Sequence, residues 1–460
     1  MGNKALCLFI CPLFAVVMQL VQVQAEMDQN GELIWRDNLN PTLVWWTPFT
    51  GVFSEYKTCG QLKCFFTADK SYLSNLHVNK TAVLFYGSDF RTENLPVFSR
   101  NSQIWSLLHE ESPKNNPILC HEEVLNLFNF TSTFSRFSTE PITLQYLRDL
   151  KQLTRLDEFI STSNKNSFLQ DGLAPVIYIQ SDCDTPSDRD TFVRELATHI
   201  KVDSYGRCLN NKKLPSHLKN GVEGMDHPDL RSLVARYKFA LAIENAACED
   251  YITEKLWRPL TLGSVPLYWG SPTVSDWMPN TNSIIDIRKF NSPEELAQHL
   301  KSLLENDKQY EKHLEHKLDG KISNKLLKYT MDNRAWGVGN DEDKINFIEN
   351  FECSVCRTLH RLNEDDSPTT ADVRHYNCKA PVTVMQSLGG AGTNRTSKVK
   401  SHEYSSWLEE WHRAKLEAQK LRKLLETGSY SPPTYHQDVL DYLIEKGHFK
   451  KFPPSLREEL

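Results

Sequence analysis

The polar residues best placed to do chemistry lie in one stretch, Lys238 to Gly270. Its first part, Phe239 to Ile243, is an apolar run with the length of a buried strand. Glu244 and Asn245 follow that run directly, and an α/β sheet presents its ligand-binding residues at this end of its strands. We therefore expect Glu244 and Asn245 to face a bound ligand.

The segment after this strand is predicted to bind a phosphate. Asp250 or Thr253 can cap a helix there, and a helix N-terminus offers unpaired N–H groups and a partial positive charge. Lys255 adds a full positive charge one turn in, and the hydroxyl of Tyr251 can donate to an oxygen. The alternative is an ordinary βαβ unit whose Glu244 and Lys255 are only solvated.

The neighbouring residues indicate which elements hold these groups in place. Gly263 can end the helix, and Val265 to Tyr268 is predicted to form the next buried strand. Pro259 lies inside the helical run, so we expect a kink or an early break there.

A pair of carboxylates, Glu110 and Glu111, forms a second candidate site. They follow a strand predicted over Trp105 to Leu108. The turn formed by Ser112 and Pro113 can hold a carboxylate facing a cleft at the strand end. Two exposed carboxylates in a loop would be ordinary, and the residues alone favour that interpretation.

A second domain is predicted to begin with strands over Ala174 to Gln180 and Ile200 to Tyr205. Arg189 lies in a helix after the first of these strands, and Tyr205 ends the second. Between them, Asp182 to Asp184 has the Asp-x-Asp pattern that holds Mg²⁺ or Mn²⁺ in many nucleotide-sugar transferases.

The stretch ENAACEDYITEKLWRPL, followed by GSVPLYWG, resembles the donor-binding segment of the α1,3-fucosyltransferases, glycosyltransferase family 10. The resemblance covers roughly Leu43 to Cys356 and is closest to the divergent branch assigned to protein O-fucosylation. It implies an α/β fold of the GT-B type, with two Rossmann-like domains facing a cleft.

The resemblance also implies roles for single residues. Glu111 matches the glutamate thought to act as base, with Glu110 as an adjacent competitor. Arginine and lysine side chains neutralise the donor diphosphate in this family, and Arg189 and Lys255 are present here. No cofactor and no catalytic metal is therefore expected, despite the Asp-x-Asp pattern. Arg136 is what is left of a paired arginine motif that could contact a ligand. The implied donor-binding residues are Arg189, Tyr205, Glu244, Asn245, Tyr251, Thr253, Glu254 and Lys255.

The implied function is inverting transfer of L-fucose from GDP-β-L-fucose, in α linkage, to a Ser or Thr hydroxyl of a folded protein domain. The expected partners are GDP-fucose and an acceptor glycoprotein or disulfide-rich domain. One alternative is α1,3-fucosylation of N-acetylglucosamine in glycans. Another is a catalytically weak, lectin-like protein, although the presence of both Glu111 and Lys255 argues against it.

Length and composition limit the number of domains and the class of partner. A chain of 460 residues is too long for one core, and its net charge of −6 gives no reason to expect a nucleic-acid partner. We predict an acceptor and base domain over 33–165, a GDP-fucose-binding domain over 170–345, and a return segment over 346–362. A polar linker, an amphipathic helix and a tail fill 363–460.

Residues 1–25 are predicted to be a targeting element. The apolar run Ala5 to Met18 is short for a membrane span, and Val23 to Ala25 fits a cleavage site. A cleaved signal peptide is therefore favoured over a type II anchor.

The chain ends in Arg457 to Leu460, a variant of the Lys-Asp-Glu-Leu retrieval signal. This signal predicts binding to a retrieval receptor and location in the endoplasmic reticulum. A Golgi membrane protein is the alternative. Candidate N-glycosylation sites are Asn79, Asn129 and Asn394.

Cysteines beyond residue 25 are odd in number, so at least one is predicted to be free in an oxidising compartment. The spacing of Cys353 and Cys356 suggests zinc or a redox site, but no second pair or nearby His pair completes a zinc set. The resemblance implies disulfides that join Cys59 and Cys64 to this pair.

Beyond the resembled region, apolar residues keep a helical period from Tyr404 to Leu425. Such a stripe packs on its own protein or on a partner, and a cofactor role is not expected. The helix adds surface that a short sugar acceptor would not require, which favours a protein acceptor.

Overall fold

The structure is a computed structural model. It describes residues 23–27, 33–37, 40–48, 53–74, 80–96, 103–219, 224, 226–338, 344–362, 369–389 and 402–448. Most of the predicted targeting segment, the sequon residues Asn79 and Asn394, and Arg457 to Leu460 lie outside these residues. The predicted cleavage after Ala25 falls within β1 (Val23–Met27), which pairs antiparallel with β2 (Leu33–Asp37).

The first domain is built on a six-stranded sheet in the order β4-β5-β3-β6-β7-β8. All neighbouring pairs are parallel except β4 and β5. Its central strands are apolar and buried because helices cover both faces of a parallel sheet. The strands are β3 (Thr42–Thr47), β4 (Ser54–Cys59), β5 (Leu62–Thr67), β6 (Thr81–Tyr86), β7 (Gln103–His109) and β8 (Phe130–Thr133).

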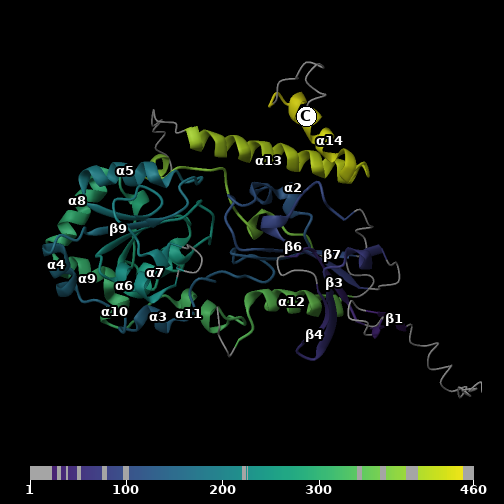
Figure 1. Cartoon of the computed structure of the whole chain (residues 1–460), viewed down its shortest axis with the longest axis horizontal. Helices are drawn as coiled ribbons and strands as arrows, with labels where there is room; N and C mark the ends of the chain where they lie inside the picture. The colour runs from purple at the N-terminus through teal and green to yellow at the C-terminus, as the bar shows by residue number, and fades with distance from the viewer. Residues whose placement is uncertain are drawn as a thin grey trace, which may run out of the picture.

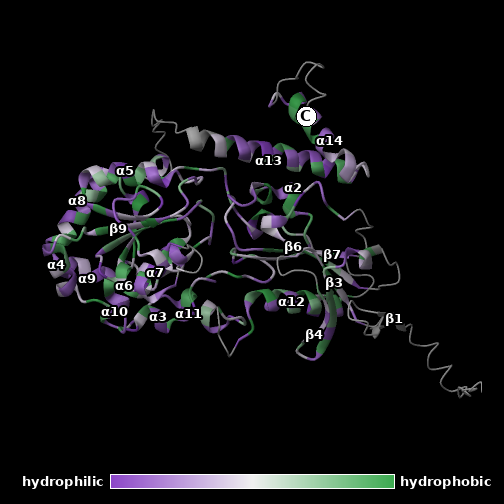
Figure 2. Ribbon diagram, in the orientation of Figure 1, coloured by the Kyte–Doolittle hydropathy of each residue, from purple (hydrophilic) through white to green (hydrophobic). Residues whose placement is uncertain are grey.

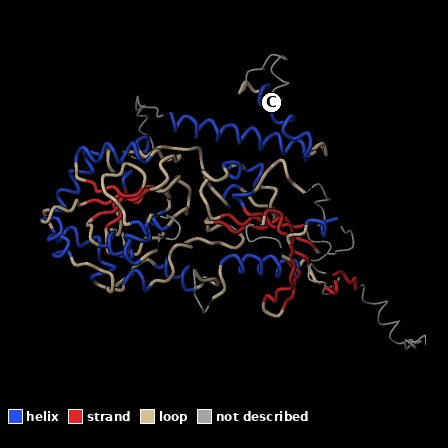
Figure 3. The backbone as a smooth tube through the Cα atoms, in the orientation of Figure 1, coloured by secondary structure: helices blue, strands red, loops and turns tan. Residues whose placement is uncertain are grey.

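The second domain holds a five-stranded parallel sheet in the order β10-β9-β11-β12-β13. Figure 3 shows the two sheets as separate red layers among blue helices. The strands are β9 (Val176–Gln180), β10 (Val202–Gly206), β11 (Phe239–Ile243), β12 (Val265–Trp269) and β13 (Ile285–Asp286). The predicted fold class, α/β with two Rossmann-like domains, is therefore confirmed.

Helices pack on both faces of the second sheet. One face carries α5 (Arg189–His199) and α8 (Pro293–Leu304), and the other carries α6 (Pro228–Ala235) and α7 (Glu254–Leu262). This arrangement leaves the carboxyl ends of the strands open toward the first domain, where ligands bind in such sheets.

The helix α7 begins and ends at the cap residues that the sequence predicts. Thr253 is its N-cap and accepts from the backbone N–H of Lys255, while Gly263 ends it with a positive φ of 72°. The expected break at Pro259 is wrong, because α7 continues to Leu262. Its proline removes one helix hydrogen bond, and the buried neighbours Leu256 and Leu260 hold the turn in place.

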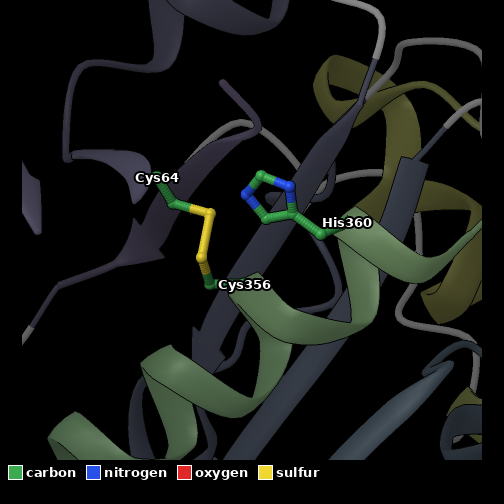
Figure 4. Close-up of side chains that lie close together, drawn as sticks. All are labelled: Cys64, Cys356 and His360. Carbon is green, nitrogen blue, oxygen red and sulfur yellow. A yellow bond between two sulfur atoms is a disulfide. The ribbon is translucent and has the colours of Figure 1, made fainter. Parts of the chain in front are cut away.

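After the second domain, the chain returns to the first. The helix α12 (Phe347–Arg361) packs against one face of the first sheet. Two disulfides, Cys59–Cys353 and Cys64–Cys356, bind it to β4 and β5. His360 lies beside the second disulfide (Figure 4), but both sulfur atoms are bonded to each other, so this group offers no thiolate to zinc.

Two further disulfides order the rest of the chain. Cys183–Cys208 lies within the second domain, and Cys248–Cys378 ties that domain to the tail. Cys120 is the free cysteine among the residues described, and it is buried. The odd cysteine that the sequence predicts is therefore this thiol.

The C-terminal helices α13 (His402–Glu426) and α14 (Pro432–Glu445) cover the other face of the first domain. Figure 1 shows α13 lying lengthwise across both domains, opposite α12. Hydrophilic and hydrophobic residues alternate along it (Figure 2), and its buried Ala414, Ala418 and Leu421 join the core beside α2 (Glu122–Leu125). The apolar stripe thus packs on its own protein.

None of the described helices is both long and apolar enough to cross a membrane.

Candidate active site

The end of β7 faces the beginning of α7, and the two bring carboxylates and an ammonium group together. Burial raises the pKa of Glu111, and the neighbouring charge of Glu110 raises it further. Lys255 acts in the opposite direction and lowers this pKa, while Glu254 raises it again. The net effect is a carboxyl group that is a stronger base than an exposed glutamate.

Glu110 lies beside Glu111 but is bound more firmly. Its Oε1 accepts from the hydroxyl of Tyr86 at 2.8 Å, and burial raises its pKa. The loop is held from the other side by Tyr376, whose hydroxyl donates to the carbonyl oxygen of Glu111 at 2.9 Å. The backbone of Glu111 is thus fixed, and its carboxylate accepts from the backbone N–H of Ser112, which lowers its pKa slightly against the effect of burial.

Glu244 does not face a ligand directly, contrary to the expectation from its position. Its side chain is fully buried, and its two oxygens accept from the backbone N–H and the hydroxyl of Thr253 at 2.8 and 2.7 Å. It therefore fixes the N-cap of α7. Gly270 makes room for it, because a Cβ there would lie 2.5 Å from Cγ of Glu244.

Lys255 lies at the first turn of α7 with its Nζ between two carboxylates. It is 3.2 Å from Oε1 of Glu254 and 3.8 Å from Oε2 of Glu244. Its Nζ also donates to the Thr253 hydroxyl at 3.2 Å. The ammonium group is therefore held at the helix N-terminus, where the helix dipole adds to its charge.

Two tyrosines close the space between Glu111 and α7. Burial raises the pKa of Tyr251, and the charges of Glu244 and Glu111 raise it further. Burial likewise raises the pKa of Tyr146, together with the charges of Glu254 and Glu111. Neither hydroxyl is bonded to a residue that the structure describes, so both stay protonated and can donate to a ligand.

Arg189 and Asn245 form one unit at the end of β11. The Arg189 guanidinium donates to Oδ1 of Asn245 at 2.9 Å and to the carbonyl oxygens of Ile243 and Asp182 at 3.2 and 2.6 Å. Arg189 is 1% exposed. It supplies positive charge beneath the strand ends, and any direct contact with a diphosphate requires Asn245 or the 182–188 loop to move.

Tyr205 lies in the core of the second domain. It is 8% exposed, and its hydroxyl lies 3.0 Å from that of Tyr237, which donates to Asp203 at 2.9 Å. We therefore correct its expected role from donor contact to packing. The reason is the side-chain direction, which alternates along a strand and places Tyr205 on the α6 side.

Arg258 is a further candidate that its sequence position alone does not single out. A cavity of about 280 Å³ opens beside α7, and Arg258 lines it together with Tyr146 and Glu254. Burial lowers the pKa of Arg258, the charge of Glu254 raises it, and its Nε has no partner among the described residues. Its position three and four residues after Lys255 and Glu254 was the available signal, since that spacing shares one helix face.

Arg136 does not face the cleft as a free cation. It forms an ion pair with Asp250 at 2.5 Å and another with Asp276 at 2.9 Å, and it stacks on Trp277. Asp250 is buried, which raises its pKa, but the hydrogen bonds from Arg136 outweigh this and lower it. This pair links the two domains, so the expected ligand contact of Arg136 is corrected to an interdomain one.

The two carboxylates of the Asp-x-Asp pattern point to different partners. Asp182 is paired with Lys114 at 2.5 Å, and Asp184 accepts from the indole N–H of Trp407 at 2.7 Å. Between them, Cys183 is bonded to Cys208. A divalent cation there would have to displace both contacts.

The sequon at Asn129 is built into the first sheet. Its Oδ1 accepts from the backbone N–H of Trp105 at 3.1 Å, and Thr131 of the same sequon is fully buried against His375 at 2.7 Å. A glycan on Asn129 would displace these contacts, so we withdraw it as a glycosylation candidate.

Comparison with known proteins identifies the family. Residues 38–146 match the model "Fucosyltransferase, N-terminal", and residues 169–375 match "Glycosyltransferase family 10 (fucosyltransferase) C-term". The proteins named GDP-fucose protein O-fucosyltransferase 3 are similar to this chain. That of Gallus gallus is 45% identical over 393 residues, covering 84% of this chain and 80% of that protein. That of Homo sapiens is 44% identical over 403 residues, covering 86% and 82%.

Among solved structures, a crystal structure of an α1,3-fucosyltransferase with GDP-fucose aligns over 72% of this chain and 93% of its own. Its identity of 14% and TM-score of 0.38 are too low to support an inference about the site. The family models and the curated relatives, by contrast, cover both domains at high similarity. The chain therefore belongs to glycosyltransferase family 10, the fucosyltransferases, and within it to the branch of the protein O-fucosyltransferases.

Proposed function

We propose that this protein transfers L-fucose from GDP-β-L-fucose to a Ser or Thr hydroxyl of a folded protein domain, with inversion at the anomeric carbon. The observation that carries the proposal is the electrostatic coupling of Glu111, a partly buried carboxyl with a raised pKa, to Lys255 at the N-terminus of α7. This coupling supports a base and a diphosphate site in one cleft. The names of the similar proteins support the donor and the class of acceptor.

In this mechanism Glu111 takes the proton of the acceptor hydroxyl while the oxygen attacks the anomeric carbon. The bond between that carbon and the β-phosphate oxygen breaks, and GDP leaves with the electron pair. Lys255 and the N–H groups at the start of α7 stabilise the charge that grows on the diphosphate. A single displacement converts the β-linked donor to an α-fucoside.

Four carboxylates contribute negative charge near Glu111 or Lys255: those of Glu110, Glu111, Glu244 and Glu254. One ammonium group cannot offset them and a diphosphate as well. We propose that Arg258 supplies the further positive charge, since Glu254 lies within its field and the cavity that both line adjoins α7. A metal ion is not required in this scheme.

The protein acceptor is tested by offering GDP-fucose with a native disulfide-bonded domain, its reduced form and free N-acetyllactosamine. We expect transfer to the native domain alone, because the proposed acceptor is a folded surface. Strong transfer to N-acetyllactosamine with none to any protein would refute the protein acceptor and favour α1,3-fucosylation of glycans. No transfer to either, together with GDP-fucose binding, would favour the lectin-like alternative.

We further propose that the reaction takes place in the lumen of the secretory pathway. Four disulfides support an oxidising compartment. Retrieval to the endoplasmic reticulum through the last four residues stays a prediction, and truncation after Leu456 tests it. A truncated protein that stays in place and is extracted only with membranes would refute it.

A further inference from the structure

A pocket of about 310 Å³ lies beside the loop that follows Glu111. Four separate parts of the chain form it: the loop after Glu111, the strand ends of the second domain, the tail over 377–387, and α13. Representative lining residues are Pro113, Ala247, Trp269, Val382, Trp407 and Trp411.

The pocket adjoins the proposed base from two directions. Pro113 follows Glu111 by two residues, and two residues of extended chain span about 7 Å. On the other side Asn377 lines the pocket, and the preceding Tyr376 donates to the Glu111 carbonyl. A group bound in the pocket therefore lies within a few residues' reach of an acceptor hydroxyl at Glu111.

The walls of the pocket are held by specific contacts. The indole N–H of Trp269 donates to Ser387 at 2.6 Å, and that of Trp407 donates to Asp184 at 2.7 Å. The Cys248–Cys378 disulfide fixes the start of the tail against the second domain. Trp411 packs edge-on against His121 of the first domain at 4.7 Å. A pocket held in this way loses little entropy when it is filled.

The chemistry of the walls selects the occupant. Proline, alanine, valine and tryptophan side chains provide little to satisfy sugar hydroxyls or a diphosphate, whose burial without partners is costly. They suit a large apolar or aromatic side chain, which gains most from burial. Glu249, Lys379 and Arg288 also line the pocket, and Arg288 is paired with Asp286. Groups of both signs are therefore present to bind the polar backbone beside that side chain.

Part of the pocket wall lies outside the residues that the family models match. Those models end at residue 375, whereas the tail wall and α13 lie beyond it. The residues matched by the models contain Glu111 and Lys255. Elements outside the family core thus complete a pocket next to the proposed base, which is where acceptor selection has to occur.

We infer that this pocket binds a large apolar or aromatic side chain of the acceptor protein and so positions its Ser or Thr at Glu111. The inference rests on the proposed function, and it names the feature of the acceptor that the enzyme recognises.

The test uses Val382→Asp, which puts a charge on the pocket wall at a residue that is 42% exposed and therefore tolerant of change. Val373→Asp is the matched control, because Val373 is 41% exposed in the same tail but does not line the pocket. Ala380→Leu, also in the tail and lining the pocket, narrows it with added apolar volume instead of a charge. Each full-length variant is assayed for transfer to the protein domain that the wild type fucosylates, and for hydrolysis of GDP-fucose without acceptor.

We expect Val382→Asp and Ala380→Leu to raise KM for the protein acceptor by about tenfold or more, the effect of losing one well-buried anchor. Hydrolysis of GDP-fucose should stay within about twofold of wild type for both, and Val373→Asp should change neither quantity. An unchanged acceptor KM in both pocket variants overturns the inference. So does a parallel loss of hydrolysis, which would assign the pocket to the donor, or an equal effect of Val373→Asp. Failure of the proposed function appears separately, as a wild-type protein that fucosylates no protein.

Discussion

At the scale of single residues, the proposal depends on which carboxylate is the base. Glu110 accepts a hydrogen bond from the Tyr86 side chain, which stabilises its ionised form and ties it to β6. Glu111 accepts from the backbone N–H of Ser112 instead, and its pKa responds to Lys255 and Glu254. Glu111 is thus the carboxylate that is coupled to the proposed diphosphate site.

Glu111→Gln should lose transfer by two or more orders of magnitude, the usual contribution of a positioned base. GDP affinity should not fall, because the amide keeps the shape and removes a negative charge that opposes the diphosphate. Calorimetry with GDP and a transfer assay measure the two effects. Glu110→Gln is the matched control, and a larger loss in that variant would move the role of base to Glu110.

The pH dependence of transfer should reflect the raised pKa of Glu111. A base works only when deprotonated, so kcat/KM should fall as the pH drops through a value above the usual 4.5 of a glutamate. Because Lys255 lowers this pKa, Lys255→Ala should move the acid limb to higher pH. A midpoint at or below 4.5, or no shift in the variant, would contradict the assignment.

Lys255→Ala should also weaken GDP binding, because it removes a full charge from the diphosphate site. We expect about a tenfold or greater rise in Kd by calorimetry. Lys301→Ala, an exposed lysine on α8, is the control and should bind GDP normally. An unchanged GDP affinity in a folded Lys255→Ala protein would rule out the contact.

At the scale of elements, the unit formed by β11, β12 and α7 works because its parts fit closely. Glu244 at the end of β11 caps the loop into α7 through Thr253, and Gly270 after β12 leaves the space that Glu244 fills. The diphosphate site thus depends on a residue that does not touch the donor.

Gly270→Ala tests that dependence. Its Cβ would lie 2.5 Å from Glu244 Cγ and 2.6 Å from the Tyr268 hydroxyl, so Glu244 must shift and release Thr253. Such overpacking costs about 1–3 kcal/mol, and we expect a lower unfolding temperature together with weaker GDP binding. Ser275→Ala, an exposed change nearby in the chain, should alter neither. Normal GDP affinity in Gly270→Ala would show that the site tolerates a displaced Glu244.

At the scale of the whole molecule, covalent and ionic links join segments that are distant in sequence. The two disulfides of α12 span 294 and 292 residues, and the Arg136–Asp250 pair joins the domains directly. These links fix the cleft in which Glu111 meets α7. The tail and α13 then cover the opposite side and complete the pocket that we propose for the acceptor.

The stabilities that the two parallel disulfides contribute should not be additive. With Cys64–Cys356 intact, Cys59–Cys353 closes a ring of only about ten residues, worth roughly 2–3 kcal/mol in the chain-entropy model. Removing both opens a loop of nearly the whole catalytic region, worth roughly 8 kcal/mol. We expect the variant with all four cysteines changed to serine to lose more thermal stability than the sum of the losses in two other variants, each of which lacks one disulfide. A simple sum would contradict this account.

Local patterns in the sequence determined much of this protein. The period of apolar residues predicts the strands β7, β11 and β12, and cap residues predict both ends of α7, because these features depend on neighbours in the chain. The donor motif identified the family for the same reason, since its residues are contiguous. Glu111 and Lys255 were therefore accessible as candidates before any contact was known.

Only the tertiary structure decided what each side chain contacts. It buried Tyr205 and Glu244, paired Arg136 with Asp250, and placed Arg258 at a cavity beside α7. It also brought the tail and α13 against the Glu111 loop to form one pocket. Such outcomes depend on packing between residues far apart in the chain, where burial and charge pairing decide which way a side chain points, and no local pattern encodes them.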